Sequence, residues 1–451
     1  MTSIKAHVVI GALPFESHLT PMRTIAQHLV PLGYQVTFIT AGNFRQSIGA
    51  IGATCFVPAG WYDVSENGVH IKIVEGASKM PPSTGPVPAV NIMASRWFAD
   101  AIPLQFEAIQ EILASSLAEN PSRPVVLLLE SSFLASLPFV LNAPGLRPKG
   151  VISVGNVPIL DINPDTPPPS SGLQPDPSPE GRARNEALNK TWLESSAILR
   201  TELNTILRGL GAKEIDQYRQ NAVLNLSTLF LQLCPPSLEF HRSNAPPTLR
   251  FTGGLPRPKH QSHNPSELPG WWSEVVNKGN NRIVAVSQGT IVNGPESLII
   301  PTLEALKDQD SILVVVALGK RGASLPAEYS IPSNARVADW IPFDALLPLS
   351  DVFVTNGGYG SFQNALANGV PLVIAPPRFA DKRDIAARVQ WSGTGVNLGT
   401  GTPTVEALKD AVLEVFNSGK YKERALEVKK EIESYDSMAI ITGAIDEVAN
   451  S

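Results

Sequence analysis

Cysteine is scarce in this 451-residue sequence. Its two cysteines, Cys55 and Cys234, lie far apart and show no metal-ligand spacing, so we expect neither a disulfide framework nor a cysteine-based metal centre. Both are expected to be reduced, buried thiols. No cluster of acidic residues suggests a cation site either, and we therefore expect a protein that needs no metal and no cofactor.

Long apolar runs are also missing. No stretch approaches the ~20 apolar residues that a membrane-spanning helix needs. The apolar run within the first eleven residues covers only four or five positions, which is too short for the apolar core of a signal peptide. These absences predict a soluble, cytoplasmic protein without a membrane span.

A strong charge of one sign is absent as well. The formal net charge is −5 at pH 7 and the basic residues are dispersed, which argues against nucleic acid or an anionic membrane as a partner. A hydrophobic content of 43% with 17% charged residues is typical of a folded globular protein. The length predicts two or three domains, whereas nothing indicates the oligomeric state.

What the sequence does contain is a regular alternation of apolar, strand-like runs with helical patterns, in both halves. Such alternation predicts βαβ units and parallel sheets. The expected strands cover residues 8–10, 34–40, 125–129, 151–154, 283–287, 313–318, 352–355 and 372–375, and the first helix covers 21–32. The predicted fold class is therefore α/β, with two Rossmann-like, doubly wound domains that face each other across a cleft.

Composition shifts suggest where these domains begin and end. We place the first domain at 1–235, a proline-rich linker at 236–280, the second domain at 281–425, and a helical tail at 426–451 that packs back on the first domain. Residues 163–184 contain seven prolines and are expected to form a surface loop or lid, poorly ordered unless something binds it.

The segment from Phe353 to Leu366 is the most informative motif. A β-branched and aromatic run ends at Gly357-Gly358, and a helical pattern begins at once, with Gly360 in its first turn. Free backbone N–H groups and the positive end of the helix dipole make such a junction a seat for a phosphate. A plain strand–helix connection is the alternative interpretation.

The first half offers a candidate acid–base pair. His18 follows the first predicted strand, and Glu130 ends the strand 125–129. Because the carboxyl ends of parallel strands share one edge of the sheet, the carboxylate can reach the imidazole. The carboxylate would hold the tautomer and stabilise the imidazolium of a general base. A structural or helix-capping role for each residue is the alternative.

The second half offers candidates for binding a nucleotide. Gly289 and Thr290 follow a strand and precede a helix, so their N–H groups and hydroxyl could meet a phosphate. Trp340, between two strands, could stack on a nucleobase, a contact worth ~1–3 kcal/mol, or could be a core residue. The pair Asp381-Lys382 could bind sugar hydroxyls or form a surface ion pair.

Aromatic residues gather near the predicted cleft loops. Each alone could belong to the core, but as a set they suit a small, apolar ligand, because apolar pockets with few polar groups orient such molecules. The candidates for this second binding site are Phe15, Trp61, Trp97, Phe98, Phe133 and Phe379.

Taken in order, these segments resemble the inverting family 1 glycosyltransferases, the UDP-sugar-dependent enzymes of the GT-B fold. The resemblance covers nearly the whole chain. The sequence Thr355-Asn356-Gly357-Gly358-Tyr359-Gly360 is similar to that of a microbial, fungal or bacterial, branch. The family motif also matches Trp340, Pro342, Ser361, Asn364, Gly369-Val370-Pro371 and Asp381-Lys382.

The resemblance implies a role for each matched residue. Trp340 would stack on uracil, with the backbone of Ile341 pairing with the base edge, and Asn364 would face the ribose. Asp381 and Lys382 would face the sugar. The diphosphate would be held by Thr290, Asn356, Gly358 and Ser361.

Three positions depart from the family pattern. Asn356 stands where most members have a phosphate-binding histidine, and an amide can donate a hydrogen bond but carries no charge. Asn364 replaces a ribose-binding glutamate. Lys382 replaces a glutamine, which adds positive charge near the sugar or the leaving group.

The function expected from these residues is an inverting transfer of a hexose, glucose first, from a UDP-sugar to a hydroxyl of a phenolic, flavonoid or polyketide acceptor. The alternatives are a sugar-nucleotide epimerase of the same fold and a non-catalytic sugar-nucleotide binding protein. Nucleotide binding without a transfer product would favour either one. A nicotinamide dehydrogenase is disfavoured because Gly11-Ala12-Leu13-Pro14 lacks the dinucleotide fingerprint.

Overall fold

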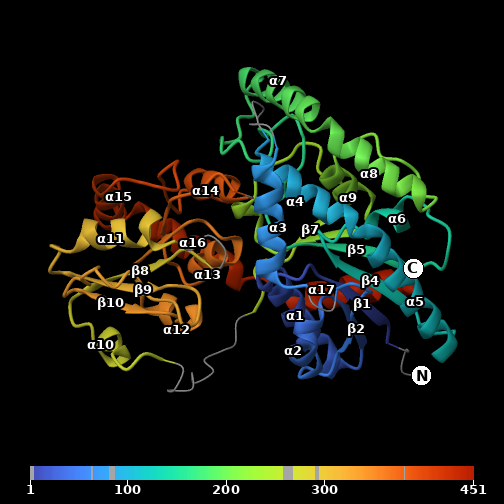
Figure 1. Cartoon of the computed structure of the whole chain (residues 1–451), viewed down its shortest axis with the longest axis horizontal. Helices are drawn as coiled ribbons and strands as arrows, with labels where there is room; N and C mark the ends of the chain where they lie inside the picture. The colour runs from blue at the N-terminus through green and yellow to red at the C-terminus, as the bar shows by residue number, and fades with distance from the viewer. Residues whose placement is uncertain (1–4, 62–63, 81–86, 257–267, 290–293, 380) are drawn as a thin grey trace.

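The computed structural model describes residues 5–61, 64–80, 87–256, 268–289, 294–379 and 381–451. The chain forms two α/β lobes that lie side by side (Figure 1). Each lobe is built around one parallel sheet with helices on both faces. The two doubly wound, Rossmann-like lobes confirm the predicted fold class.

The N-terminal lobe contains a seven-stranded sheet with the order β3-β2-β1-β4-β5-β6-β7. Its strands are β1 His7–Gly11, β2 Gln35–Ile39, β3 Thr54–Phe56, β4 Val125–Glu130, β5 Gly150–Gly155, β6 Leu229–Gln232 and β7 Leu249–Phe251. Every neighbouring pair of strands is parallel, and β1 pairs with β4 in the register that places Gly11 opposite Leu129. The order reverses between β1 and β4, so the switch point of this sheet lies there.

Helices cover both faces of that sheet. Val8 and Ile10 of β1 pack on one face together with the first and last helices, whereas Val9 packs on the other. This alternation explains why the strands are continuous apolar runs: a parallel sheet is buried on both sides. The helices are α1 Glu16–Leu29, α2 Arg45–Gly49, α3 Glu66–Ser78, α4 Ala89–Asp100, α5 Ile102–Glu119, α6 Ser136–Val140, α7 Pro179–Ser195, α8 Ala197–Gly209 and α9 Arg219–Leu226.

The C-terminal lobe repeats this plan with six strands in the order β10-β9-β8-β11-β12-β13. They are β8 Arg282–Ser287, β9 Ile312–Ala317, β10 Ala335–Ala338, β11 Val352–Thr355, β12 Leu372–Ile374 and β13 Gly395–Asn397. The helices of this half are α10 Trp272–Val276, α11 Ile299–Leu306, α12 Phe343–Leu346, α13 Tyr359–Ala367, α14 Lys382–Trp391, α15 Val405–Ser418 and α16 Lys420–Glu433. The switch point of this sheet lies between β8 and β11.

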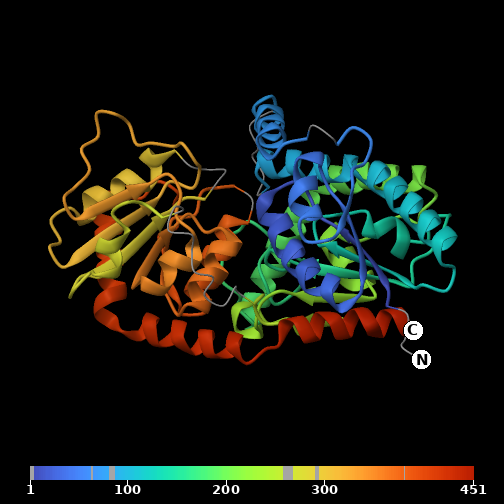
Figure 2. The ribbon, with the colours of Figure 1, turned by 90° about the horizontal axis from the view of Figure 1, so that it is seen from below.

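The last helix, α17 Ser437–Asn450, returns to the N-terminal lobe. Figure 2 shows α16 and α17 running in sequence beneath both lobes. Met438, Ile441 and Ile445 pack into the N-terminal core, and Asp446 accepts a hydrogen bond from the Tyr34 hydroxyl at 2.5 Å. The helical tail therefore ties the two lobes together.

Three local features differ from the expectations. The helix predicted from residue 21 begins at Glu16, so His18 lies in its first turn, and Pro21 lies inside the helix. Strand β7 falls within the range expected to be linker, because its three residues pair with β6 and extend the N-terminal sheet.

Residues 163–178 are not an exposed lid. Most of the segment is buried or half-buried, and the Asn163 side chain accepts hydrogen bonds from the backbone N–H groups of Asp165 (2.9 Å) and Thr166 (3.1 Å). Helix α7 begins at Pro179. The prolines therefore shape a packed connection whose polar groups bond within the segment and to neighbouring elements. In the described part of the chain, no helix is long and apolar enough to span a membrane.

Candidate active site

His18 and Glu130 meet at the switch point of the N-terminal sheet. Helix α1 follows β1 and carries His18 in its first turn, while Glu130 is the last residue of the neighbouring strand β4. The Nδ1 atom of His18 lies 2.9 Å from Oε2 of Glu130. The strand order alone thus delivers both side chains to one point, where open α/β sheets bind their ligands.

The carboxylate of Glu130 is fixed in place by its surroundings. Its side chain is wholly buried, whereas that of His18 is 18% exposed. The backbone N–H groups of Leu13 (3.2 Å) and Ser132 (3.3 Å) donate hydrogen bonds to its oxygens. A carboxylate that accepts a hydrogen bond from the Nδ1–H group of His18 selects the tautomer of the imidazole in which Nε2 is unprotonated. This arrangement suits a general base whose imidazolium is stabilised by a buried carboxylate.

Aromatic rings adjoin this pair. The Phe15 ring centroid lies 5.5 Å from that of His18 and 5.8 Å from that of Trp97. Trp97 stacks on Trp61 at 6.1 Å and meets Phe98 edge-on at 5.7 Å, and Trp61 contacts Phe133 at 6.5 Å. Five of the six predicted acceptor residues therefore form one connected cluster beside the imidazole.

Members of this cluster differ in exposure. Phe133 is fully buried, Trp61 is 5% exposed and Phe15 is 8% exposed, whereas Trp97 and Phe98 are half-buried. The sixth candidate, Phe379, is half-buried in the C-terminal lobe, between β12 and α14. The acceptor roles of all six residues stay predictions.

At the C-terminal switch point the loops after β8 and β11 lie side by side. Gly289 follows β8, and Gly357 turns the chain after β11 with φ +87°, a conformation that favours glycine. Gly358 is the N-cap residue of α13. Gly360, Ser361 and Asn364 follow on the first two turns and are exposed or half-buried. Thr290, predicted to bind the diphosphate, lies outside the described residues.

Asn356 links these two loops. Its side chain is buried, with 4% exposure, and its Nδ2 atom donates a hydrogen bond to the backbone oxygen of Gln288. The amide thus joins the end of β11 to the end of β8. It supplies no positive charge at the point where the family resemblance implies a phosphate-binding residue.

Trp340 follows β10 and keeps 37% of its surface exposed. Its flat ring is therefore partly accessible at the carboxyl edge of the sheet. The Arg321 guanidinium lies over that ring, 5.7 Å from its centroid. Ile341, by contrast, is 2% exposed and anchors the segment in the core. Trp340 thus keeps part of its ring surface exposed, while its neighbour fixes the backbone.

Asp381 and Lys382 open helix α14, Asp381 as the N-cap residue and Lys382 as the first helical residue. Burial lowers the pKa of the Lys382 ammonium, which the Asp381 carboxylate partly offsets. A Cβ atom placed on Gly358 would lie 3.3 Å from Lys382 Nζ. The N-terminal ends of α13 and α14 therefore converge on one place.

Contacts between the lobes involve residues that the sequence did not single out. Gln232, the last residue of β6, donates a hydrogen bond from Nε2 to the Tyr359 hydroxyl at the start of α13 (2.8 Å). The backbone N–H of Ser170 lies 3.0 Å from both carboxylate oxygens of Asp384 in α14. The carboxyl edges of the two sheets thus face each other, with the candidate residues of both lobes around the same junction.

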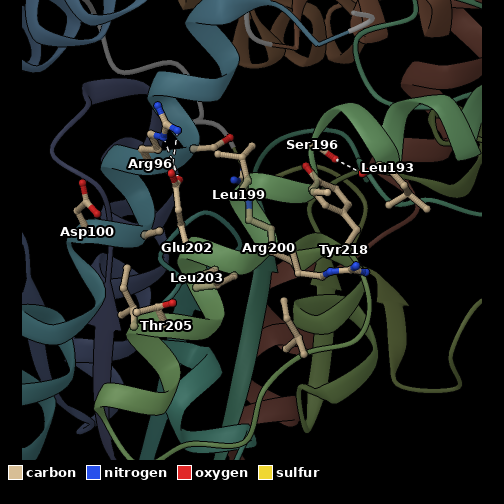
Figure 3. A pocket seen from close by; sticks show the side chains of 16 residues that line it. Arg96, Asp100, Leu193, Ser196, Leu199, Arg200, Glu202, Leu203, Thr205 and Tyr218 are labelled. Carbon is tan, nitrogen blue, oxygen red and sulfur yellow. Dashed lines mark hydrogen bonds and ion pairs between the residues drawn. The ribbon is translucent and has the colours of Figure 1, made fainter.

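A cavity of about 410 Å³ lies elsewhere in the N-terminal lobe, between α4, α8 and the start of α9 (Figure 3). Its rim includes Arg96, which is ion-paired with Glu202 at 2.8 Å. Ser95 and Ala99 of α4 line it, but none of the predicted site residues does. The cavity lies behind the helix that carries Trp97, and we assign it no part in the proposed reaction.

The described residues contain no group of three or more His, Cys, Asp or Glu side chains arranged to hold a metal ion. Cys55 and Cys234 are both free thiols; Cys234 is buried and Cys55 is partly buried. Burial raises the pKa of Cys234 to about 12, so this thiol is not a nucleophile at neutral pH.

Two facing Rossmann-like lobes, with a base candidate in one and a phosphate seat in the other, define the GT-B class of glycosyltransferases. Comparison with known proteins agrees. The family profile "Erythromycin biosynthesis protein CIII-like, C-terminal domain" matches residues 301–447. The chain is 36% identical to UDP-glucosyltransferase B1 of Starmerella bombicola over 448 residues, with 99% of each chain covered.

A second relative is UDP-glycosyltransferase 2 of Phaeomoniella chlamydospora, which is 39% identical over 453 residues and covers 99% of this chain and 97% of its own. Among solved structures, the glycotransferase of kitacinnamycin superposes with a TM-score of 0.72 at 20% identity, covering 99% of both chains. The chain therefore belongs to the family 1, UDP-dependent glycosyltransferases. It transfers a sugar from a UDP-sugar to an acceptor.

Proposed function

We propose that the protein transfers glucose from UDP-glucose to a hydroxyl of a small lipophilic acceptor such as a phenol, flavonoid or polyketide, with inversion at the anomeric carbon. The observation that carries this proposal is the hydrogen bond between His18 Nδ1 and Glu130 Oε2 at the junction of the lobes. The names of several relatives as UDP-glucosyltransferases support glucose as the donor sugar.

In the proposed reaction, Nε2 of His18 takes the proton of the acceptor hydroxyl while Glu130 stabilises the imidazolium. The acceptor oxygen forms a bond to the anomeric carbon as the bond from that carbon to the β-phosphate oxygen breaks. Negative charge grows on the leaving diphosphate, where the N-terminus of α13 presents its backbone N–H groups.

The donor would lie along the C-terminal lobe. Uracil would stack on Trp340, Asn364 would contact the ribose, and Asp381 would contact the sugar. The diphosphate would lie at Gly358, Gly360 and Ser361, beside Gly289. Fixed dipoles and side chains would take over charge neutralisation, so we propose that the reaction needs no metal ion, and activity that persists in a chelator tests this point.

The acceptor class follows from the aromatic cluster. Phe15 contacts His18, and the half-buried Trp97 and Phe98 continue the same surface. Large rigid rings with few polar groups favour a flat or hydrocarbon-rich acceptor. The cytoplasmic location inferred from the sequence stays a prediction.

Mass spectrometry tests the proposal directly. Mixed phenol, flavonoid and polyketide acceptors are incubated with a panel of UDP- and TDP-sugars, with and without a chelator. We expect a mass gain of one hexose on an acceptor with UDP-glucose. If the protein binds UDP-glucose yet transfers nothing to any acceptor, or epimerises the sugar, the proposed function is wrong.

A further inference from the structure

Lys382 places a positive charge at the predicted phosphate-binding site, where the N-terminal ends of α13 and α14 converge. It is the first residue of α14, and its Nζ atom lies 3.3 Å from the position of a Cβ atom on Gly358, the N-cap residue of α13. The Oγ atom of Ser361 lies 3.4 Å from the same Cβ position. The ammonium group thus lies among the residues predicted to hold the diphosphate.

This is an unfavourable place for a cation in the ligand-free protein. The N-terminal ends of α13 and α14 both carry partial positive charge, which repels an ammonium. Lys382 is also partly buried, and the loss of hydration lowers its pKa.

The Nζ atom of Lys382 has no hydrogen-bond or ion-pair partner in the described part of the chain, although the charge of the adjacent Asp381 partly offsets its burial. Two other lysines of the lobe do have such partners: Lys278 is 2.9 Å from Asp351, and Lys422 donates to the backbone oxygen of Gly369. A partly buried ammonium that faces two helix N-termini is stabilised when an anion binds between them.

The neighbouring candidate cannot take this role. Asn356 is neutral, and its amide already donates to the Gln288 backbone oxygen. The chain therefore lacks a positive charge at Asn356 and has one at Lys382, whose Nζ atom lies beside Gly358, two residues further along the same loop.

On the basis of the proposed function, we infer that Lys382 binds the diphosphate of the UDP-sugar and neutralises the leaving group rather than reading the sugar hydroxyls. The ammonium keeps its proton throughout. It donates hydrogen bonds to the β-phosphate oxygen that receives the electron pair of the broken bond, while the acceptor proton goes to His18. Lys382 would thus supply the positive charge that the neutral Asn356 lacks.

Titration calorimetry with UDP and uridine separates the two roles. Lys382→Gln, which removes the charge and keeps a polar side chain, is expected to weaken UDP binding roughly 10- to 100-fold and to leave uridine binding unchanged. Lys382→Arg, which keeps the charge, should retain most of the UDP affinity. The ligand-free Lys382→Gln protein should melt at or above the temperature of the wild type, which shows that the variant folds.

Equal UDP affinity in the wild type and Lys382→Gln, together with an altered preference among UDP-sugars, would overturn this inference and leave the proposed function intact. A wild-type protein that binds neither UDP nor UDP-glucose would overturn both. A matched loss of uridine affinity in Lys382→Gln would show a general disturbance of the lobe and would also count against the inference.

Discussion

Arg388 of the C-terminal lobe is ion-paired with Glu239 of the N-terminal lobe, and both side chains are almost completely buried. The same guanidinium donates to the backbone oxygen of Ile159 at 3.1 Å and lies 4.2 Å from the centre of the Phe240 ring. Burial raises the pKa of Glu239, but Arg388 and Arg242 outweigh this effect and hold it below its usual value. The lobes are therefore joined by a charged, desolvated contact.

Breaking this contact should destabilise the protein. Arg388→Met leaves the buried Glu239 with one cation fewer, and removing one partner of a buried ion pair costs about 3 kcal/mol. We expect a melting temperature lower by roughly 3 °C in scanning calorimetry. The double variant Arg388→Met/Glu239→Gln should recover part of the loss. An unchanged melting temperature in the single variant would show that the contact contributes little.

The burial of Asp384 beside Ser170 should make stability depend on pH. Burial raises the pKa of Asp384 from 3.8 to about 7, although Arg388, Arg383 and the Ser170 N–H favour the charged form. The folded protein thus keeps a proton that the unfolded chain loses between about pH 4 and 7, so this group lowers stability as the pH rises through that window.

Asp384→Asn removes this titration and can still accept from the Ser170 N–H. The stability of this variant relative to the wild type should therefore increase between pH 5 and pH 8, by on the order of 3 kcal/mol in the free energy of unfolding. Its melting temperature should rise relative to that of the wild type over the same range. Scanning calorimetry of both proteins across that range measures the difference. A constant difference at every pH would mean that Asp384 titrates normally.

Much of the fold follows from the sequence because parallel strands are buried on both faces. Strands such as β4 and β8 read as continuous apolar runs, and the residues directly after them must lie at the carboxyl edge of the sheet. For that reason His18 and Glu130, 112 residues apart, could be paired from the order of strands and helices alone. The glycines after β11 marked the second switch point in the same way.

The contacts between lobes could not be predicted in this manner. Glu239 and Arg388 are 149 residues apart, and each alone looks like a surface charge. The loop at 163–178 carries so many prolines that it resembles an exposed segment, yet Ser170 docks on a helix 214 residues away. Strand β7 has only three half-buried residues, too few to show a pattern.

Trp340 offers a test of nucleoside recognition. Replacing it with alanine removes the stacking surface, which should weaken the binding of UDP and of uridine equally, by about 1–3 kcal/mol. Because the ring is 37% exposed, the melting temperature should change little. Trp340→Phe is the matched control and should retain most of the affinity. A loss confined to UDP in calorimetry would contradict a role in stacking on the base.

Glu130 tests how the base is positioned. Glu130→Gln keeps the shape of the side chain but removes the charge that stabilises the imidazolium, so kcat should fall on the order of 10²-fold or more. The KM for the donor should stay near the wild-type value, because Glu130 lies in the other lobe. A drop in donor affinity with unchanged kcat would indicate a purely structural role.

The most direct test of the account is the rate of hexose transfer by His18→Ala under saturating UDP-glucose and acceptor. With the base removed, product formation should fall on the order of 10²–10⁴-fold, while calorimetry shows UDP binding as in the wild type. Transfer at the wild-type rate by His18→Ala would contradict the account, because no proton would then pass through the imidazole that Glu130 holds.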